Sequence, residues 1–319
     1  MSLSEVVEMG EVDLSVEVAR IRMKNPVMVA SGTFGYGEEL ADLVDLNKLG
    51  AIVVKTITLR PRLGNPPPRI VETPSGMLNS IGLQNVGLEE FVSRKMPFLR
   101  KLEIPVIVSI GGERPDDYVQ LAQELSGVEG VSGLELNISC PNVKRGGMAI
   151  GVDPEETYEL VWRVRMVTNL PLIVKLTPNA ADVTEIARAA VDAGAEAISL
   201  VNTFLAMAVD VERRRPMLST ITGGLSGPAI RPIAVRMVWQ VAQSVEVPVI
   251  GMGGIMSWRD AMEFLIVGAS AVAVGTANLI DPTAPIKVIE GIESYLKRHG
   301  FSSVREVIGS LETTPKKRR

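Results

Sequence analysis

Cysteine and histidine are almost absent from this sequence of 319 residues, which contains one of each. One cysteine cannot form an internal disulfide bond, which suits a reducing compartment. It also cannot ligate an iron–sulfur cluster or a structural zinc ion, because those sites need several thiolates. The histidine, His299, lies in a C-terminal helical pattern away from every predicted strand end, so we expect it at the surface. We therefore expect no metal site.

Long apolar runs and an excess of positive charge are also lacking. Lysine and arginine total 33 against 37 aspartates and glutamates, a net charge of −4, so no general basic field attracts nucleic acid. No apolar run approaches membrane-spanning length, and the N-terminus carries Glu5, Glu8 and Glu11 instead of a secretory signal. With 46% hydrophobic residues, the chain is predicted to be a compact cytoplasmic protein that does not enter membranes.

Strand-like and helix-like segments alternate along the chain, which is the pattern of a parallel α/β sheet. Helical spacing is clearest in two apolar stripes, one over residues 183–191 and one over residues 230–245 that includes Ile233. A short hairpin over residues 12–18 and 21–23 is predicted to precede the main fold. Eight apolar strands are then predicted, over residues 27–30, 51–55, 106–110, 134–138, 172–176, 197–201, 249–251 and 271–274.

The predicted strands begin in two alternating ways. Proline precedes the odd strands, whereas the even ones follow Gly50, Gly133, Gly194 and Gly268, which we expect in the left-handed position just past a helix. Eight such units predict an α/β fold that closes into a (β/α)8 TIM barrel, with long loops at its C-terminal face. An open doubly wound sheet is the rival, but no Gly-x-Gly-x-x-Gly follows the first strand. We expect one domain over residues 1–311 and a basic, frayed tail over residues 312–319.

Polar and glycine residues follow the predicted strands at one rim of the barrel, where such folds carry function. Two of the loops there, over residues 56–86 and 202–228, are long enough to cover an active site or to make an oligomer contact. The strand ends carry Ser31, Gly32, Thr33, Lys55, Thr56, Ser109, Asn137, Cys140, Asn142, Lys175, Asn202, Thr203, Gly253, Gly254, Gly275 and Thr276.

The last two strand ends favour a phosphorylated ligand. Barrels commonly bind phosphate after the seventh and eighth strands. Gly253-Gly254 and Gly275-Thr276 can present unobstructed backbone N–H groups at those two positions. Lys55 and Lys175 add positive charge nearer the middle of the barrel mouth.

Cys140 is the predicted proton acceptor, by elimination. Carboxylates are scarce at the strand ends, and Glu135 alternates with Leu134 and Leu136, which are expected to face inward. Cys140 follows the apolar run and has polar neighbours, so we favour a general base or nucleophile over a buried structural thiol. Lys175 as a Schiff-base nucleophile is the strongest alternative.

Three motifs resemble the dihydroorotate dehydrogenases, the flavin enzymes of pyrimidine synthesis, and the similarity extends from Ala30 to Thr276. Cysteine in the active loop resembles class 1, since the membrane-associated class 2 enzymes have serine there. The Gly-Gly-Leu-Ser-Gly-Pro segment is similar to class 1B, whose members pass electrons to NAD through a partner subunit. The motifs are Asn79-Ser80-Ile81-Gly82-Leu83-Gln84-Asn85, Asn137-Ile138-Ser139-Cys140-Pro141-Asn142 and Thr222-Gly223-Gly224-Leu225-Ser226-Gly227-Pro228.

The resemblance implies oxidation of dihydroorotate to orotate with one FMN per chain. In that reaction Cys140 removes the C5 proton while hydride leaves C6 for flavin N5. The implied FMN contacts are Ser31, Lys55, Thr56, Ser109, Asn137, Lys175, Val201, Gly227, Gly253, Gly254, Gly275 and Thr276. The implied dihydroorotate contacts are Lys55, Asn79, Ser80, Ile81, Gly82, Leu83, Asn137, Asn142, Asn202 and Thr203.

The resemblance also implies a separate electron-transfer subunit with FAD and an iron–sulfur cluster, and a homodimer of this chain as the core of a heterotetramer. The lone cysteine supports this division, because the chain cannot ligate such a cluster itself. Two alternatives stay open. One is another flavin-dependent dihydropyrimidine oxidoreductase, and the other is a lyase that uses Lys175 as a Schiff base on a phosphorylated substrate.

Overall fold

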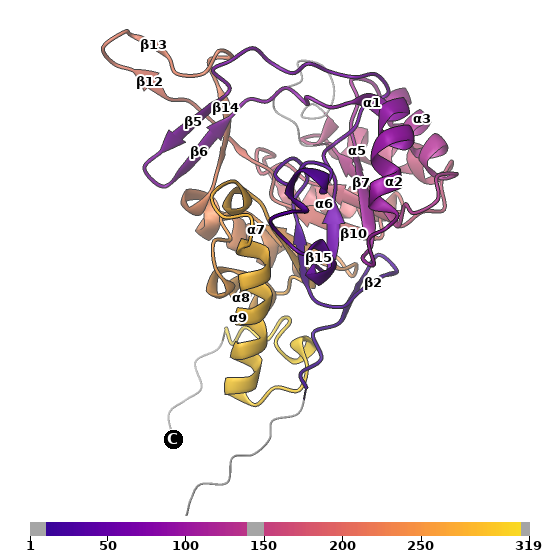
Figure 1. The fold of residues 1–319 in the computed structure, drawn as a ribbon, viewed down its shortest axis with the longest axis vertical. Coiled ribbons are helices and arrows are strands. Elements are labelled where there is room, and N and C mark those ends of the chain that lie inside the picture. Colours follow the sequence, from indigo (N-terminus) through magenta and orange to yellow (C-terminus); the bar gives the residue numbers. More distant parts are fainter. Residues whose placement is uncertain (1–10, 139–149, 314–319) are drawn as a thin grey trace, which may run out of the picture.

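A computed structural model describes residues 11–138 and 150–313 of the chain (Figure 1). Residues 1–10, 139–149 and 314–319 lie outside the described residues. Two predicted site residues, Cys140 and Asn142, therefore lie outside them, as does most of the predicted tail.

Eight parallel strands close into a barrel. They pair in chain order, and the register Val272↔Val27 joins the last strand to the first. The predicted (β/α)8 barrel is confirmed, and each predicted strand is present with its ends within about two residues of the expected bounds. The strands are β3 (Val27–Val29), β4 (Ala51–Val53), β7 (Val106–Ile110), β8 (Gly133–Asn137), β9 (Leu172–Lys175), β10 (Ala197–Leu200), β15 (Val249–Met252) and β16 (Ala271–Val274).

Burial on both faces explains why these segments form the barrel wall. Every residue of the eight strands is buried, as in a parallel sheet that is covered by helices. The glycine prediction is right for Gly194 and Gly268, whose φ angles are 105° and 119°. It is wrong for Gly50 and Gly133, which are not left-handed. Close packing excludes a side chain at Gly50 instead, because a Cβ there would lie 2.2 Å from the Asn25 carbonyl oxygen.

Helices surround the barrel and follow its strands (Figure 1). The long ones are α3 (Pro115–Leu125), α5 (Pro154–Arg165), α6 (Val183–Asp192), α7 (Arg231–Ala242), α8 (Trp258–Ile266) and α9 (Ala284–His299). Between β4 and β7 lie the short α1 (Gly87–Glu90), a π-helical turn (Phe91–Lys95) and α2 (Met96–Leu99). Single 3-10 turns lie at Glu38–Leu40, Leu46–Lys48, Pro228–Ile230, Thr276–Leu279 and Val304–Glu306.

Of the two predicted apolar helical stripes, one is confirmed and the other is wrong at one position. In α6 the residues Val183, Ile186 and Ala187 are buried, as the spacing predicts. In α7 the stripe is wrong at Ile233, which is 41% exposed. The neighbouring Ala234 begins the buried face of this helix instead, so Ile233 lies just outside it.

The predicted N-terminal hairpin is confirmed as β1 (Val16–Val18) and β2 (Ile21–Met23). Its two-residue turn, Ala19 and Arg20, has positive φ at both positions, the conformation that suits a tight hairpin. Arg20 forms an ion pair with Glu196, just before β10, and Glu196 also pairs with Arg165 at 2.8 Å. Burial raises the pKa of Glu196, but the two guanidinium groups outweigh it and hold that pKa below its usual value. The hairpin is thus fixed to the N-terminal end of the barrel.

The two long loops predicted either to cover an active site or to make an oligomer contact pair with each other. They form a four-stranded sheet, here called the mouth sheet, in the order β11 (Phe204–Ala206), β14 (Gly223–Ser226), β6 (Gly76–Asn79) and β5 (Ile70–Thr73). A smaller hairpin, β12 (Val209–Asp210) with β13 (Arg215–Pro216), projects beyond it (Figure 1). None of these strands is predicted above, because both segments are assigned there to loops.

No helix in the described part of the chain is long and apolar enough to cross a membrane. Within residues 11–138 and 150–313, no group of three or more histidine, cysteine, aspartate or glutamate side chains is placed to hold a metal ion. The cytoplasmic location, and the division into one domain and a tail, stay predictions.

Candidate active site

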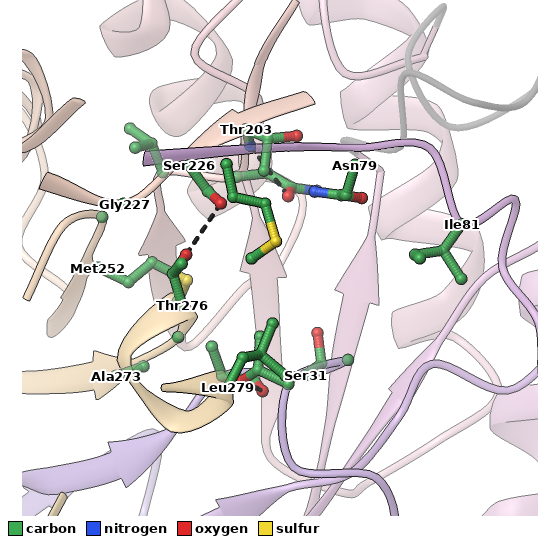
Figure 2. Close-up of a pocket in the computed structure, with 18 of the residues that line it drawn as sticks. Ser31, Asn79, Ile81, Thr203, Ser226, Gly227, Met252, Ala273, Thr276 and Leu279 are labelled. Carbon is green, nitrogen blue, oxygen red and sulfur yellow. Dashed lines mark hydrogen bonds between the residues drawn. The ribbon is translucent and has the colours of Figure 1, made fainter. Parts of the chain in front are cut away.

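A cavity of about 230 Å³ opens at the C-terminal ends of the barrel strands, beneath the mouth sheet (Figure 2). The barrel supplies one side of its wall, and residues from β5, β6 and β14 supply the other. The predicted site residues that line it are Ser31, Lys55, Thr56, Asn79, Ile81, Gly82, Leu83, Asn137, Lys175, Val201, Asn202, Thr203, Gly227, Gly253, Gly254, Gly275 and Thr276. The structure therefore brings together strand ends and motifs that are far apart in the sequence.

Two predicted site residues lie behind the cavity wall. Ser109 is fully buried, and its hydroxyl lies 2.9 Å from the Thr56 hydroxyl, so it supports a lining residue. Ser80 is also fully buried, and its Oγ has no hydrogen-bond partner among the described residues. Ligand contacts at Ser80 and Ser109 stay predictions, as do those of Cys140 and Asn142, which the structure does not describe.

Several lining residues are not predicted from the sequence. Ser226 and Met252 line the cavity directly beside predicted positions, within the Gly-Gly-Leu-Ser-Gly-Pro motif and at the end of the seventh strand. Figure 2 shows Ser226 joined to Thr276, whose hydroxyl donates to Ser226 Oγ at 2.9 Å. Ile70 and Met77 belong to the mouth sheet, and their segment gives no sequence signal because it is assigned to a loop.

Asn137, at the end of β8, is held by a buried network. Its Nδ2 donates to Thr56 Oγ1 at 3.1 Å, and Thr56 in turn meets Ser109. Tyr118 of α3 donates its phenolic hydrogen to the Asn137 carbonyl oxygen at 2.9 Å. Because both the side chain and the backbone are anchored, the carboxamide of Asn137 presents a fixed hydrogen-bonding edge to the cavity.

Lys175, at the end of β9, lies on the cavity floor and is 4% exposed. Its Nζ donates to Ser31 Oγ at 3.2 Å and lies 3.8 Å from Glu135 Oε1. This contact corrects the expectation that Leu134 and Leu136 face inward. Glu135 instead enters the barrel interior, because its partner Lys175 contacts Ser31 from across the barrel.

Glycines leave the backbone bare at the ends of β14 and β15. Gly227, Gly253 and Gly254 have φ angles of 91°, 125° and 80°, which residues with a Cβ rarely adopt. A Cβ at Gly254 would also lie 2.8 Å from the Gly227 carbonyl oxygen. These positions form a narrow cradle beside the 3-10 turn that leads into α7, a suitable place for an anion.

The Asn79–Asn85 motif forms a well-anchored loop under the mouth sheet. Asn85 Nδ2 donates to the Leu83 carbonyl at 2.7 Å and to Thr58 Oγ1 at 2.8 Å. Asn79 donates to the Gly224 carbonyl at 3.3 Å across the β6–β14 pair. The loop therefore holds Leu83, which has a left-handed φ of 56°, against the cavity.

Cations and carboxamides line the described part of the cavity, whereas carboxylates and imidazoles do not. Lys55 and Lys175 supply positive charge, and Asn79, Asn137 and Asn202 supply amides. No aspartate, glutamate or histidine belongs to the wall formed by residues 11–138 and 150–313. The site therefore suits an anionic ligand with a hydrogen-bonding ring, and its described residues contain no conventional carboxylate base.

Comparison with known proteins decides the family. The family model for dihydroorotate dehydrogenases matches residues 13–296, which is most of the chain. The chain belongs to the dihydroorotate dehydrogenase family. The sequence-based family prediction is thereby confirmed.

Similar proteins within this family carry a more specific name. The chain is 59% identical over 305 residues to a protein of Geotalea uraniireducens, covering 96% of this chain and 100% of that one. It is 57% identical to one of Geotalea daltonii, covering 95% and 100%, and 56% identical to one of Bacteroides thetaiotaomicron, covering 94% and 99%. All three are named dihydroorotate dehydrogenase B (NAD(+)), catalytic subunit, so the predicted resemblance to class 1B is confirmed.

Proposed function

We propose that the chain is the catalytic subunit of an NAD-linked dihydroorotate dehydrogenase that oxidises dihydroorotate to orotate in pyrimidine synthesis. The observation that carries this proposal is the set of residues that line one cavity. A glycine cradle, two lysines and three carboxamides face the same space, and its described wall contains no carboxylate. Family membership and the names of the similar proteins support the same activity.

The residues present fit FMN. The cradle at Gly253 and Gly254, together with Gly275 and Thr276, suits the phosphate, because bare N–H groups and a hydroxyl can reach its oxygens. When bound, the flavin ring supplies the group that accepts hydride. Lys175, buried in the cavity wall, would offer positive charge to a bound flavin, whose ring becomes more negative on reduction. The remaining proposed FMN contacts are Ser31, Lys55, Thr56, Ser109, Asn137, Val201 and Gly227.

The rest of the cavity suits dihydroorotate, a ring of alternating N–H and C=O groups that carries a carboxylate. Lys55 is the proposed partner of that carboxylate. The amides of Asn79, Asn137 and Asn202 match the ring, since a carboxamide both donates and accepts. The proposed contacts also include Ser80, Ile81, Gly82, Leu83, Asn142 and Thr203.

Cys140 is the proposed general base that takes the C5 proton. It follows Asn137 by three residues in the chain, and Asn137 lines the cavity at the end of β8. The described cavity wall offers no histidine or carboxylate for this task. A thiolate is a competent base where nearby positive charge favours it, and two lysines line the same cavity as Asn137.

Electron transfer to NAD is assigned to a partner. We propose a separate subunit carrying FAD and an iron–sulfur cluster, bound to a homodimer of this chain in a heterotetramer. The whole sequence contains one cysteine, which is too few to ligate such a cluster. The words "catalytic subunit" in the names of similar proteins agree with a division of labour.

The Schiff-base alternative is less favourable. A lysine that attacks a carbonyl needs access to its substrate and a free lone pair. Lys175 is instead 4% exposed, donates to Ser31 and lies beside the carboxylate of Glu135. These contacts suit a fixed positive charge better than a nucleophile.

The test begins with the purified chain. We expect it to be yellow, to release about one FMN per chain on denaturation, and to lose its colour anaerobically with dihydroorotate while orotate forms. Dihydrouracil, which lacks the carboxylate, should bleach it far more slowly, because the group that Lys55 is proposed to bind is then missing. A colourless chain that borohydride traps with a carbonyl substrate would support the lyase instead. Full NAD reduction by this chain alone would contradict the partner subunit.

A further inference from the structure

Glu135 is a buried carboxylate that the proposed reaction does not use. It is 2% exposed, and its Oε2 accepts a hydrogen bond from Ser199 Oγ at 3.2 Å. Its Oε1 is buried and accepts no hydrogen bond from the described residues, although it lies 3.8 Å from Lys175 Nζ. Burying a carboxylate with an unsatisfied oxygen is costly, and an apolar side chain would fill this space more cheaply. Its presence inside the barrel therefore calls for a functional explanation.

Lys175 connects Glu135 to the cavity. Lys175 and Ser31 line the cavity, whereas Glu135 and Ser199 do not. The polar groups thus run in the order Ser199, Glu135, Lys175 and Ser31, from β10 through β8 and β9 to the end of β3. Because these strands are not all neighbours, the chain of contacts crosses the barrel interior. Any influence of Glu135 on a bound ligand must pass through Lys175 or through its own electric field.

We propose that Glu135 is a positioning residue that holds the Lys175 ammonium at the cavity floor and offsets its charge, so that a flavin bound there has a lower reduction potential. The inference rests on the proposed function, because it requires flavin in this cavity. An unopposed lysine would stabilise the reduced, more negative flavin. Glu135, 3.8 Å from Lys175, weakens that stabilisation. Electrons then pass on readily, which suits an enzyme whose final acceptor, NAD, is a weak oxidant.

The experiment measures the flavin midpoint potential of the purified flavin-loaded chain against reference dyes. Glu135→Gln removes the charge but keeps the shape and the ability to bond Ser199. We expect it to retain FMN and to raise the equilibrium constant for flavin reduction about tenfold, which is about 30 mV for a two-electron couple. Lys175→Gln should shift the potential in the opposite direction. The double variant should lie between the two single variants.

The matched control is Glu293→Gln, which removes the same charge from an exposed pair with Lys297 on α9. Its potential should equal that of the wild-type chain. The proposal is overturned if Glu135→Gln holds FMN at an unchanged potential, or if Glu293→Gln shifts the potential equally. A wild-type chain without flavin would instead overturn the proposed function, so the two failures are distinguishable.

A second comparison applies if Glu135→Gln does not fold. Removing one partner of a buried ion pair leaves the other charge uncompensated, and removing both restores neutrality. The double variant Glu135→Gln/Lys175→Gln should then melt at a higher temperature than Lys175→Gln. A double variant that melts at a lower temperature than Lys175→Gln would show that the two groups are not coupled, and the proposal would be withdrawn.

Discussion

The barrel and the mouth sheet differ in how their strands are buried. Every residue of the eight barrel strands is buried, whereas β5 and β11 alternate between exposed and half-buried positions. The mouth sheet also takes two strands from each of two separate loops. The barrel therefore gains its stability from apolar burial, whereas the mouth sheet depends more on backbone pairing between loops.

This difference assigns separate tasks to the two regions. The barrel fixes Asn137, Lys175 and the Gly253-Gly254 part of the glycine cradle, and the mouth sheet places Asn79 and Ser226 above them. A segment with few buried apolar contacts opens locally at low free-energy cost. We therefore expect the mouth sheet to admit and release substrate while the barrel keeps the cofactor bound. Substitutions in the two regions should then change different measurements.

The largest effect is expected at Cys140, in the segment between β8 and α5 that belongs to neither region. Cys140→Ala should keep its flavin, because the cofactor contacts of the barrel are unchanged. Reduction of that flavin by dihydroorotate should slow about 10²–10⁴-fold, the usual effect of losing a general base. Stopped-flow bleaching measures this rate directly.

Cys140→Ser refines the same prediction. A hydroxyl is a poorer base than a thiolate near neutrality, so this variant should react appreciably only at higher pH. Wild-type bleaching rates in Cys140→Ala would assign the proton transfer to another group.

The second-largest effect is expected in the mouth sheet at Gly224, which pairs with Asn79 in the β6–β14 ladder. A Cβ there would lie 2.0 Å from Thr203 Oγ1, so Gly224→Ala must displace the cavity edge. We expect the KM for dihydroorotate to rise about tenfold or more, with flavin content close to wild type. Gly127→Ala is the control, because its added Cβ would meet only the Glu124 carbonyl oxygen at 3.9 Å. A lower melting temperature with an unchanged KM would contradict the assigned tasks.

The same contrast explains which parts of the fold the sequence predicts. Barrel strands such as Val106–Ile110 are mostly apolar runs that begin after proline or glycine, so they stand out locally. The mouth-sheet strand Gly223–Ser226 has neither an apolar run nor alternation, and one of its two partner strands, β6, lies in the other loop. Such pairing depends on the closed barrel bringing the two loops together, and no local pattern encodes it.

Local sequence patterns likewise predict only part of the candidate site. Residues at strand ends are predictable because a closed barrel carries all of them to one rim. The sequence does not predict which face of β8 points into the barrel. Alternation separates Glu135 from Leu134 and Leu136, but it does not say which set faces inward. Hydrophobicity favours the leucines, but in a barrel the outer face is covered by helices and is equally dry. The polar partners Lys175 and Ser199, on other strands, decide that Glu135 faces inward.

The third prediction tests the barrel wall at Gly251 of β15. A Cβ there would lie 2.7 Å from Phe264 Cδ1, on a fully buried ring of α8. Gly251→Ala should therefore lower the free energy of unfolding by about 1–3 kcal/mol, and the melting temperature by several degrees. The KM of the folded fraction should be unchanged, because the mouth sheet is intact. A raised KM with wild-type stability would contradict this assignment, because the barrel wall would then affect substrate binding and not the stability of the fold.

The smallest effect is expected at Asp281, which follows the rim residue Leu279 and links the last barrel strand to α9. Hydrogen bonds from Lys287 Nζ at 2.6 Å and from the Thr283 hydroxyl at 2.6 Å lower the pKa of its carboxyl from 3.8 to about 2. A lowered pKa in the folded state stabilises the fold above the unfolded value of 3.8, and this stabilisation is lost as the pH falls towards 2.

Asp281→Asn should therefore melt slightly below the wild-type chain at pH 7, and the gap should begin to close below about pH 4. Thermal melting of both proteins from pH 7 to pH 3 measures this gap, with the KM at pH 7 as the second readout. Because the group is exposed and does not itself line the described cavity, that KM should not change. A gap that is constant over the whole pH range would mean that the charge of Asp281 does not contribute, and that only the shape of the turn into α9 matters.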